Sequence, residues 1–161
     1  MKKYLVCSDI HGRDSYLETA LSKNQDIDCV VIAGDLEIDT YDIEDIVRRF
    51  SSPKTALIMV KGNCDSYMTT TSTLPSTRTF SLGSKHKALL THGHLYQARL
   101  DVMSYSAMEN ECDVVIFGHI HKQVDTFEFG IRFLNPGALR NRSYMILTVD
   151  DNDEISVEFK G

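Results

Sequence analysis

The chain is poor in the features that mark linkers, membrane segments and secretion signals. Its 161 residues include only three prolines, and no low-complexity tract, linker or internal repeat divides them. No segment approaches the roughly 20 apolar residues that cross a bilayer, and the start, MKKYLVCSDIHG, lacks the apolar stretch of a secretory signal. Because 42% of the residues are apolar and 25% are charged, we expect one globular domain over residues 1–161.

Cysteine pairs and excess positive charge are also absent. Cys7, Cys29, Cys64 and Cys112 form no CxxC pair, which favours reduced thiols in a cytoplasmic protein. The formal charge of −6 disfavours nucleic acid as a partner, because nonspecific binding depends on Lys and Arg at phosphates. Two bound divalent cations would add four charges and leave −2, so a local site could still attract an anion. We therefore expect a small-molecule ligand and no membrane, and homo-oligomerisation stays open.

Short apolar runs alternate with helical patterns over most of the chain. Five runs predict strands buried on both faces, at residues 4–7, 29–33, 56–60, 88–90 and 114–117. Apolar residues at helical spacing lie between them, over about 14–21, 40–50 and 96–110, with Asp39 or Thr40 as a cap of the second helix. After Val124, short stretches separated by Gly, Asn and Asp predict antiparallel strands. The pattern predicts an α/β fold with a mixed sheet or a pair of sheets flanked by helices.

Each of the five apolar runs leads into a polar cluster. These clusters are SDIHG (8–12), GDLE (34–37), KGNCD (61–65), THGH (91–94) and GHIH (118–121). In open α/β sheets, ligands bind at the carboxyl ends of the strands, so the five clusters could converge on one site. The pair His119 and His121 would mean little alone, since short motifs often occur by chance.

The clusters supply a mixed set of oxygen and nitrogen ligands. The candidate metal ligands are Asp9, His11, Asp35, Asn63, His92, His119 and His121. Carboxylate, amide and imidazole groups suit Mn, Fe, Ni or Zn, and the set is too large for a single zinc. It suits two divalent metal ions that share a bridging carboxylate and activate water. Of these metals we favour Mn.

The order DxH, GD, GN, HGH and GHxH, followed by NPG at 135–137, resembles the calcineurin-like metallophosphoesterase superfamily. The short length is similar to its small bacterial phosphodiesterases of the YfcE type. The resemblance runs from Ser8 to Gly137 and implies a four-layer fold, with two mixed sheets sandwiched between helices. It also implies the metal ligands, which are Asp9, His11 and His121 for the first ion, Asn63, His92 and His119 for the second, and Asp35 as the bridge.

The activity implied by the resemblance is that of a hydrolase. We expect a dinuclear metal-dependent phosphoesterase, more specifically a phosphodiesterase, in which a metal-bridging hydroxide attacks phosphorus in line. The rival hypothesis is a noncatalytic scaffold on the same fold, like the small subunit of retromer, which has lost part of the metal set. All seven ligand positions are filled in this chain, which favours the enzyme.

The residue that protonates the leaving group departs from the family pattern. Many relatives read GNH, where that histidine is thought to act as the acid, whereas this chain reads GNCD. Cys64 is therefore either a functional residue or a small apolar filler, and His94 is an alternative acid or phosphate contact. Asn63 could both ligate metal and hold a phosphoryl oxygen. Asp65 could orient a ligand histidine or cap a loop.

Three further features of the sequence lie outside these motifs. We expect His86 to lie on solvated surface in a hairpin-like turn, beside two lysines. The polar stretch 66–80 could wall one side of the site or form a plain excursion. Arg13, Arg140 and Arg142 flank the proposed loops, and ordinary surface positions are favoured for each of them.

Overall fold

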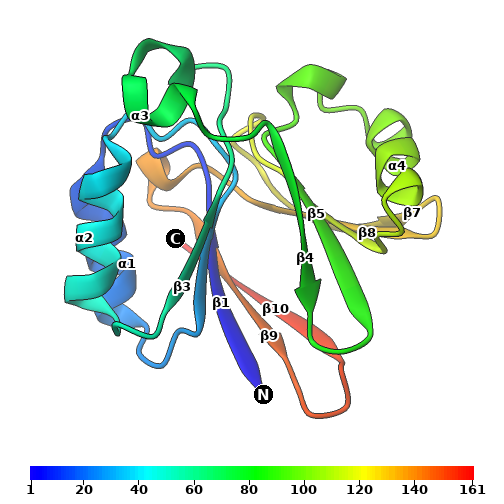
Figure 1. Ribbon diagram of the computed structural model, residues 1–161. Coiled ribbons are helices and arrows are strands. Elements are labelled where there is room, and N and C mark those ends of the chain that lie inside the picture. The colour runs from blue at the N-terminus through cyan, green and yellow to red at the C-terminus, as the bar shows by residue number, and fades with distance from the viewer.

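The computed structural model describes residues 1–161 and contains two five-stranded sheets packed face to face, with helices on their outer sides (Figure 1). The first sheet consists, in spatial order, of β10 (Ile155–Lys160), β9 (Tyr144–Val149), β1 (Lys2–Cys7), β2 (Cys29–Ile32) and β3 (Ala56–Met59). The second consists of β4 (Thr77–Leu82), β5 (His86–Thr91), β6 (Val114–Ile116), β8 (Ile131–Pro136) and β7 (Gln123–Glu128). Both sheets are mixed, which confirms the expected fold class.

Helices cover the outer faces of the two sheets. The longer ones are α1 (Asp14–Lys23) and α2 (Thr40–Phe50) on the first sheet and α4 (Leu100–Glu109) on the second. The shorter ones are η1 (Asp65–Tyr67), α3 (Thr69–Ser72), η2 (His94–Tyr96) and η3 (Leu139–Asn141). The Asp39 side chain accepts a hydrogen bond from the Tyr41 N–H at 2.9 Å, so Asp39 is the cap of α2. No helix has the length and apolar composition needed to span a bilayer.

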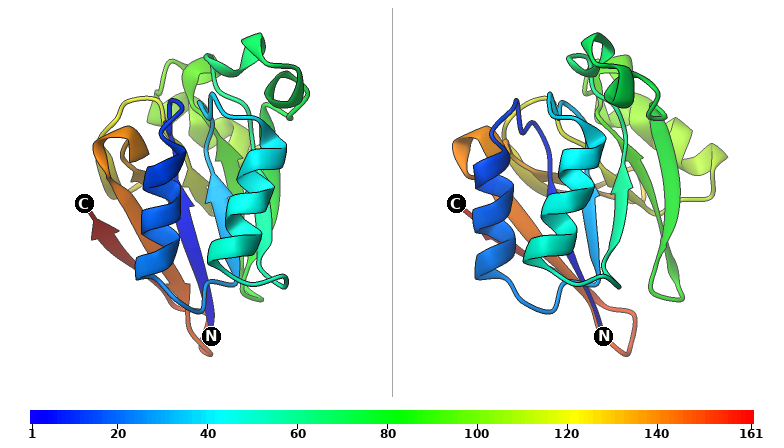
Figure 2. Two further views of the ribbon diagram at one scale, coloured as in Figure 1. Left: turned by 90° about the vertical axis from the view of Figure 1, so that its left-hand side faces the viewer. Right: turned by 60° about the vertical axis from the view of Figure 1, so that its left-hand side comes forward.

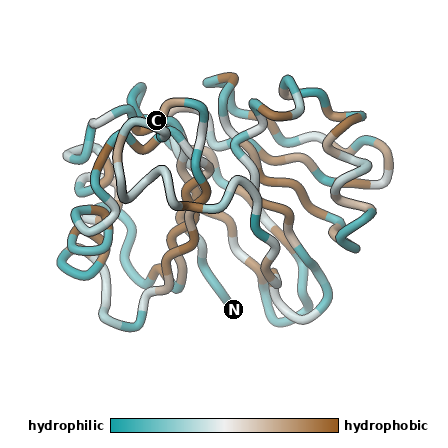
Figure 3. Tube along the Cα trace, turned by 45° about the horizontal axis from the view of Figure 1, so that its top comes forward, coloured by the Kyte–Doolittle hydropathy of each residue, from teal (hydrophilic) through white to brown (hydrophobic).

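Both faces of the central strands are apolar because each face has its own partner. In β1, Leu5 packs among residues of α1 and α2, whereas Val6 packs among residues of the second sheet. A strand that is buried on both sides shows a continuous apolar run in place of an alternating pattern. Figure 3 shows these apolar segments running through the paired sheets.

The direction of the strands places several loops at one edge of the molecule. β1, β2 and β3 run parallel, and so do β5 and β6. Parallel strands end at the same edge of their sheet, and the loops that follow them gather at the top of Figure 1. The polar clusters of the sequence occupy these loops.

Three features of the structure differ from the sequence-based expectations. The stretch 66–80 contains α3 and most of β4, an edge strand paired with β5. β3 is also an edge strand, so Ala56 is exposed instead of buried. The helix expected from about residue 96 begins at Leu100, because Gln97 and Ala98 adopt left-handed backbone conformations that a helix does not allow.

Candidate metal centre

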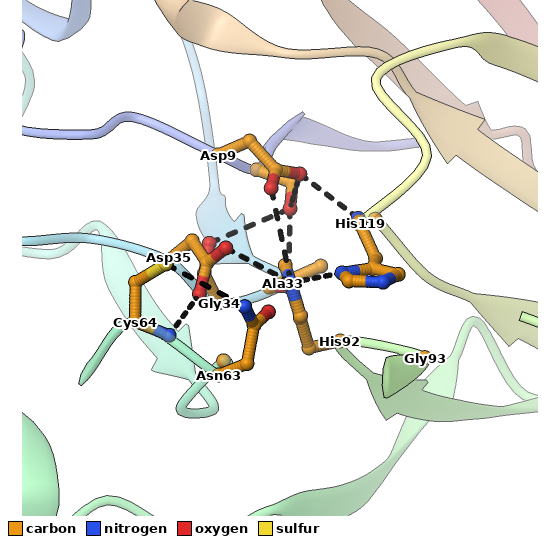
Figure 4. Close-up of polar contacts among 12 residues, drawn as sticks. Asp9, Ala33, Gly34, Asp35, Asn63, Cys64, His92, Gly93 and His119 are labelled. Carbon is orange, nitrogen blue, oxygen red and sulfur yellow. Dashed lines mark hydrogen bonds and ion pairs between the residues drawn. The ribbon is translucent and has the colours of Figure 1, made fainter. Parts of the chain in front are cut away.

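Five loops bring the candidate ligands together at the carboxyl ends of the strands (Figure 4). The loop after β1 carries Asp9 and His11, the loop after β2 carries Asp35, and the loop after β3 carries Asn63; His92 follows β5, and His119 and His121 follow β6. Asp9, Asp35 and His92 are buried, whereas His121 lies at the exposed rim. Residues more than 100 positions apart thus face one another.

The first group of ligand atoms surrounds one oxygen of Asp9. Its Oδ1 lies 3.1 Å from Nε2 of His121 and 3.5 Å from Nε2 of His11. The other oxygen, Oδ2, accepts hydrogen bonds from the Ser8 hydroxyl at 2.7 Å and the His119 N–H at 3.0 Å. The carboxylate is therefore held through one oxygen, and the other is directed at the two imidazoles.

The second group of ligand atoms surrounds Asp35. Its Oδ2 lies 3.1 Å from Nε2 of His92, and Nδ1 of His119 lies 3.3 Å from that same His92 nitrogen. Nδ1 of His92 lies 2.7 Å from the Ala33 carbonyl, which can only accept, so Nδ1 carries a proton and Nε2 is the nitrogen that faces Asp35. Nε2 of His11, from the first group, is 3.7 Å from Asp35 Oδ2. Asp35 thus stands between the two groups.

The donor set fits divalent metal ions. Within Asp9, His11 and His121, and within Asp35, His92 and His119, the ligand atoms all lie within 4.8 Å of one another. Nε2 of His11 is also buried without a hydrogen-bond partner. A buried polar atom without a partner is costly, and a metal ion at this point would supply one. Nitrogen and carboxylate oxygen are the ligands that Mn, Fe and Zn accept.

Burial and these contacts set the protonation states of Asp35 and His119. Burial opposes ionisation of Asp35, but hydrogen bonds from His92 and from the Cys64 N–H outweigh it and lower the Asp35 pKa to about 2. Burial lowers the pKa of His119, and the neighbouring His92 lowers it further. Asp35 is therefore a carboxylate at neutral pH, and His119 is held neutral. These are the protonation states in which both side chains bind metal.

The backbone of the loops is strained at the candidate ligands. Positive φ values occur at Asp9 (55°), His11 (48°), Asp35 (56°), His119 (72°) and His121 (55°). Residues other than glycine seldom adopt this region, and such conformations cluster at functional sites. Gly62 is needed for a separate reason, since a Cβ there would collide with Asp35 Oδ1.

Asp65 holds two of the loops in place. Its buried carboxylate accepts hydrogen bonds from the backbone N–H groups of Gly62, Asp35, Leu36 and Glu37, at 2.8 to 3.1 Å. No ligand histidine contacts it, so of the two roles left open by the sequence the loop cap is correct. The adjoining stretch supports the cap, because the Thr71 hydroxyl donates to the Asp65 carbonyl at 2.7 Å.

Glu37 is a site residue that sequence reasoning missed. Its Oε1 lies 2.7 Å from Nδ1 of His11. The carboxylate therefore holds the proton on Nδ1 and leaves the buried Nε2 with a lone pair directed into the site. The GDLE cluster that contains Glu37 was the only signal available, and it carried no indication of a partner 26 residues away.

The candidate catalytic residues lie beside the two groups. Asn63 is exposed, with Nδ2 3.5 Å from Cys64 Sγ, and Figure 4 places it next to His92. The ligand atoms of Cys64, His11 and Asp35 lie within 4.8 Å of one another. Burial and the nearby Asp35 and Glu37 carboxylates raise the pKa of Cys64 to about 11. Cys64 is thus a neutral thiol that faces the site.

His94 also faces this region. Its ring centroid is 5.4 Å from that of His92 and 6.4 Å from that of His119, and its buried Nδ1 has no hydrogen-bond partner. Burial lowers its pKa, and the charge of His92 adds to this effect. His94 is therefore a neutral imidazole with one nitrogen available.

A sandwich of two mixed sheets with carboxylate and imidazole clusters on its strand-end loops defines a metallophosphoesterase. The chain belongs to the calcineurin-like phosphoesterase superfamily, whose domain matches residues 2–152. It is 31% identical over 164 residues to probable metallophosphoesterase YsnB of Bacillus subtilis, covering 96% of this chain and 88% of the relative. It is 30% identical over 176 residues to phosphodiesterase YfcE of Escherichia coli K12, covering 98% and 91%.

Solved structures share the fold over nearly the whole chain. A Streptococcus pneumoniae TIGR4 protein, described as a predicted phosphoesterase, superposes with a TM-score of 0.76 at 27% identity, covering 98% of this chain and 88% of that one. Vps29 of Entamoeba histolytica complexed with zinc has a TM-score of 0.73 at 22% identity, covering 98% of both chains. The latter likeness concerns the fold alone.

Proposed function

We propose that this metallophosphoesterase is a dinuclear metal-dependent phosphodiesterase that hydrolyses a small phosphate diester in the cytoplasm. The observation that carries the proposal is the presence of two neighbouring ligand groups that meet at Asp35. Nε2 of His11 is buried between Asp9 and Asp35 and has no hydrogen-bond partner. One group would hold the first ion and the other the second, with Asp35 shared. Asn63 would complete the second set.

Two divalent ions, when bound, lower the pKa of water and neutralise charge on the phosphoryl oxygens. The remaining work falls to the side chains of this chain. Glu37 holds His11 in one tautomer, and the Ala33 carbonyl does the same for His92. Asn63 at the rim would hold a phosphoryl oxygen in place. His94 and Cys64 are the candidates for giving a proton to the leaving oxygen. Cys64 is a neutral thiol and carries its proton, whereas His94, whose pKa is lowered, would first have to take up a proton.

A diester substrate is supported by the relative named as a phosphodiesterase, which matches 98% of this chain. Manganese is supported by the ligand set, because imidazoles provide four of the six ligand atoms in the two groups and magnesium prefers oxygen. A cytoplasmic location is supported by the four free thiols.

The rival proposal is a noncatalytic scaffold, supported by the fold shared with Vps29. Binding of metal alone does not separate the two, since that structure also contains zinc. Turnover separates them. A scaffold needs no strained ligand loops, and this chain has them.

The test is hydrolysis of bis(p-nitrophenyl) phosphate by the purified protein before and after treatment with a chelator. We expect chelation to abolish turnover, and Mn²⁺ to restore it better than Mg²⁺ does. Full recovery with Mg²⁺ alone would contradict the assignment of imidazole ligands. No turnover with any divalent ion would favour the scaffold.

A further inference from the structure

A second pocket lies on the α1 side of the first sheet, outside the metal centre. It has a volume of about 550 Å³, within the usual range for small-molecule sites. Its walls are α1, the end of η3 and the final residues of β10, and the ring of Tyr144 lines it from β9. In Figure 2, α1 and α2 lie side by side on this face, and β10 extends beyond the edge of α1.

The pocket concentrates positive charge in a chain whose net charge is −6. Lys23, Arg142 and Lys160 line it, and no acidic side chain does. Lys160 is paired with Glu158 at 2.7 Å, whereas Lys23 and Arg142 take part in none of the ion pairs of the chain. Lys23 and Arg142 therefore have no ion-pair partner within 4.0 Å in the chain.

Arg142 is held in position toward the pocket. Its guanidinium carbon lies 5.1 Å from the ring centroid of Tyr16, a cation–π distance. Its backbone adopts φ 68° at the end of η3, and its N–H donates to the Leu139 carbonyl at 2.7 Å. A guanidinium that is fixed in this way can form paired hydrogen bonds with a phosphate at little further entropic cost.

The floor of the pocket offers a directed hydrogen-bond donor. The Tyr144 side chain is buried, and its hydroxyl accepts a hydrogen bond from Nδ2 of Asn24 at 2.8 Å. The hydroxyl proton itself has no acceptor within the protein. A tyrosine has one proton to donate, so this donor is available to a ligand.

We infer that this pocket binds a small phosphorylated molecule, with Lys23 and Arg142 on the phosphate groups and the Tyr144 hydroxyl as a further donor. A volume of about 550 Å³ exceeds what inorganic phosphate fills and leaves room for an organic portion of the ligand. Tyr16 lines the pocket and would contact that portion. This site is independent of the proposed catalytic one.

The test is NMR titration of the Zn²⁺-loaded protein, which is diamagnetic, with α,β-methylene-ADP, a diphosphate that hydrolases do not readily cleave. The metal centre is expected to bind this probe as well, so the two sites must be read from different signals. η3 is hydrogen-bonded to the Ser8 and Asp9 carbonyls, at 2.8 and 3.1 Å. Signals from residues 8 and 9 therefore report on both sites, and we assign the metal centre by 61–65 and 118–121 and the pocket by 15–24 and 142–144.

The expected result is a saturable shift of the pocket signals that adenosine does not produce. The double variant Lys23→Gln/Arg142→Gln should weaken binding at these signals by about tenfold or more, because each charged hydrogen bond is worth more than 1 kcal/mol. Its metal-centre signals should respond as in the wild type. Both residues are exposed, so the fold should tolerate the change.

The matched control is Lys54→Gln/Lys85→Gln, which removes the same charge from two exposed lysines outside the pocket. Pocket shifts that survive Lys23→Gln/Arg142→Gln, or that fall equally in the control, would overturn the proposal. So would shifts confined to 61–65 and 118–121, since the probe would then occupy the metal centre only. Equal pocket shifts with adenosine would show that the phosphate groups do not contribute to binding, and this result would also overturn the proposal.

Discussion

At the scale of single residues, the contact between Glu37 and His11 joins the metal ligand to a second loop. A carboxylate that accepts from a ligand imidazole raises its basicity and fixes its orientation. Glu37→Gln keeps an acceptor oxygen but removes the charge. We expect Mn²⁺ affinity, measured by calorimetry on stripped protein, to fall by roughly ten- to a hundredfold.

The control for Glu37 is Glu44→Gln, which removes the same charge from an exposed position on α2. Its Mn²⁺ affinity should stay near that of the wild type. If the two variants bind Mn²⁺ equally well, the Glu37 contact has no influence on the metal centre.

Cys64 presents a second prediction at this scale, because a neutral thiol stands where many relatives carry a histidine. A positioned acid contributes on the order of 10²- to 10⁴-fold, and only where the leaving oxygen needs a proton. We expect Cys64→His to improve kcat/KM for alkyl phosphodiesters far more than for p-nitrophenyl esters. The measurement is kcat/KM across diesters of rising leaving-group pKa, for wild type and variant at matched metal loading.

The same series distinguishes Cys64 from His94. If Cys64→His and the wild type show the same dependence on leaving-group pKa, then Cys64 does not mark a vacant acid position. In that case, a steeper dependence in His94→Ala would assign the proton to His94, whose Nδ1 is buried without a partner.

Individual site residues differed in how far the sequence could predict them. The side chains of the DxH and GHxH motifs could be placed at one site because each motif follows an apolar strand. Glu37 could not, since its role depends on how two loops meet in space. Asp65 was ambiguous because a carboxylate that caps backbone N–H groups and one that orients a histidine look alike in sequence.

At the scale of secondary structure elements, His86 connects parts of both sheets. The sequence predicted a solvated turn residue, and this was wrong. His86 begins β5 and lies 2.6 Å from the Asp113 carboxylate and 2.7 Å from the Asp153 carbonyl, in the turn between β9 and β10. The error arose because both partners are far away in the chain.

The contacts of His86 predict a pH-dependent contribution to stability. The hydrogen bond to Asp113 raises the His86 pKa above its ordinary value of 6.5, against the opposing effect of burial. The folded state therefore holds the proton more tightly than the unfolded state. The stabilisation is fully present below pH 6.5 and is lost as the pH rises through the raised value.

His86→Gln should accordingly lower the melting temperature more at pH 5.5 than at pH 9, measured in chelator so that metal release does not contribute. Because the pair is partly exposed, the difference should correspond to no more than about 1 kcal/mol. An equal loss at both pH values would show that the charge of His86 has no part in its contribution.

The elements that the sequence predicted best are those whose burial is uniform. β1, β2 and β6 are buried on both faces and show continuous apolar runs, and α2 has apolar residues at helical spacing behind the cap Asp39. β4 was missed because it is an edge strand with mostly exposed side chains, whose sequence TRTFSL resembles a polar loop. Its pairing with β5 is a long-range effect that no local pattern displays.

At the scale of the whole molecule, the two sheets place the strand ends that carry the ligands at a common edge. The first sheet supplies Asp9 and Asp35, and the second supplies His92 and His119. The ligand groups therefore combine residues of both sheets, as with Asp35, His92 and His119. Relative movement of the sheets would separate the ligands, and the apolar residues packed between them oppose it.

The measurement that tests the central claim most directly is turnover of bis(p-nitrophenyl) phosphate during titration of stripped protein with Mn²⁺, with bound metal counted at each step. We predict that activity reaches its maximum at two ions per chain. Asp35→Asn, which alters the carboxylate shared by both groups, should lose more activity than His121→Ala, which alters one group. Full activity at one ion per chain, or equal losses in the two variants, would contradict a dinuclear centre bridged by Asp35.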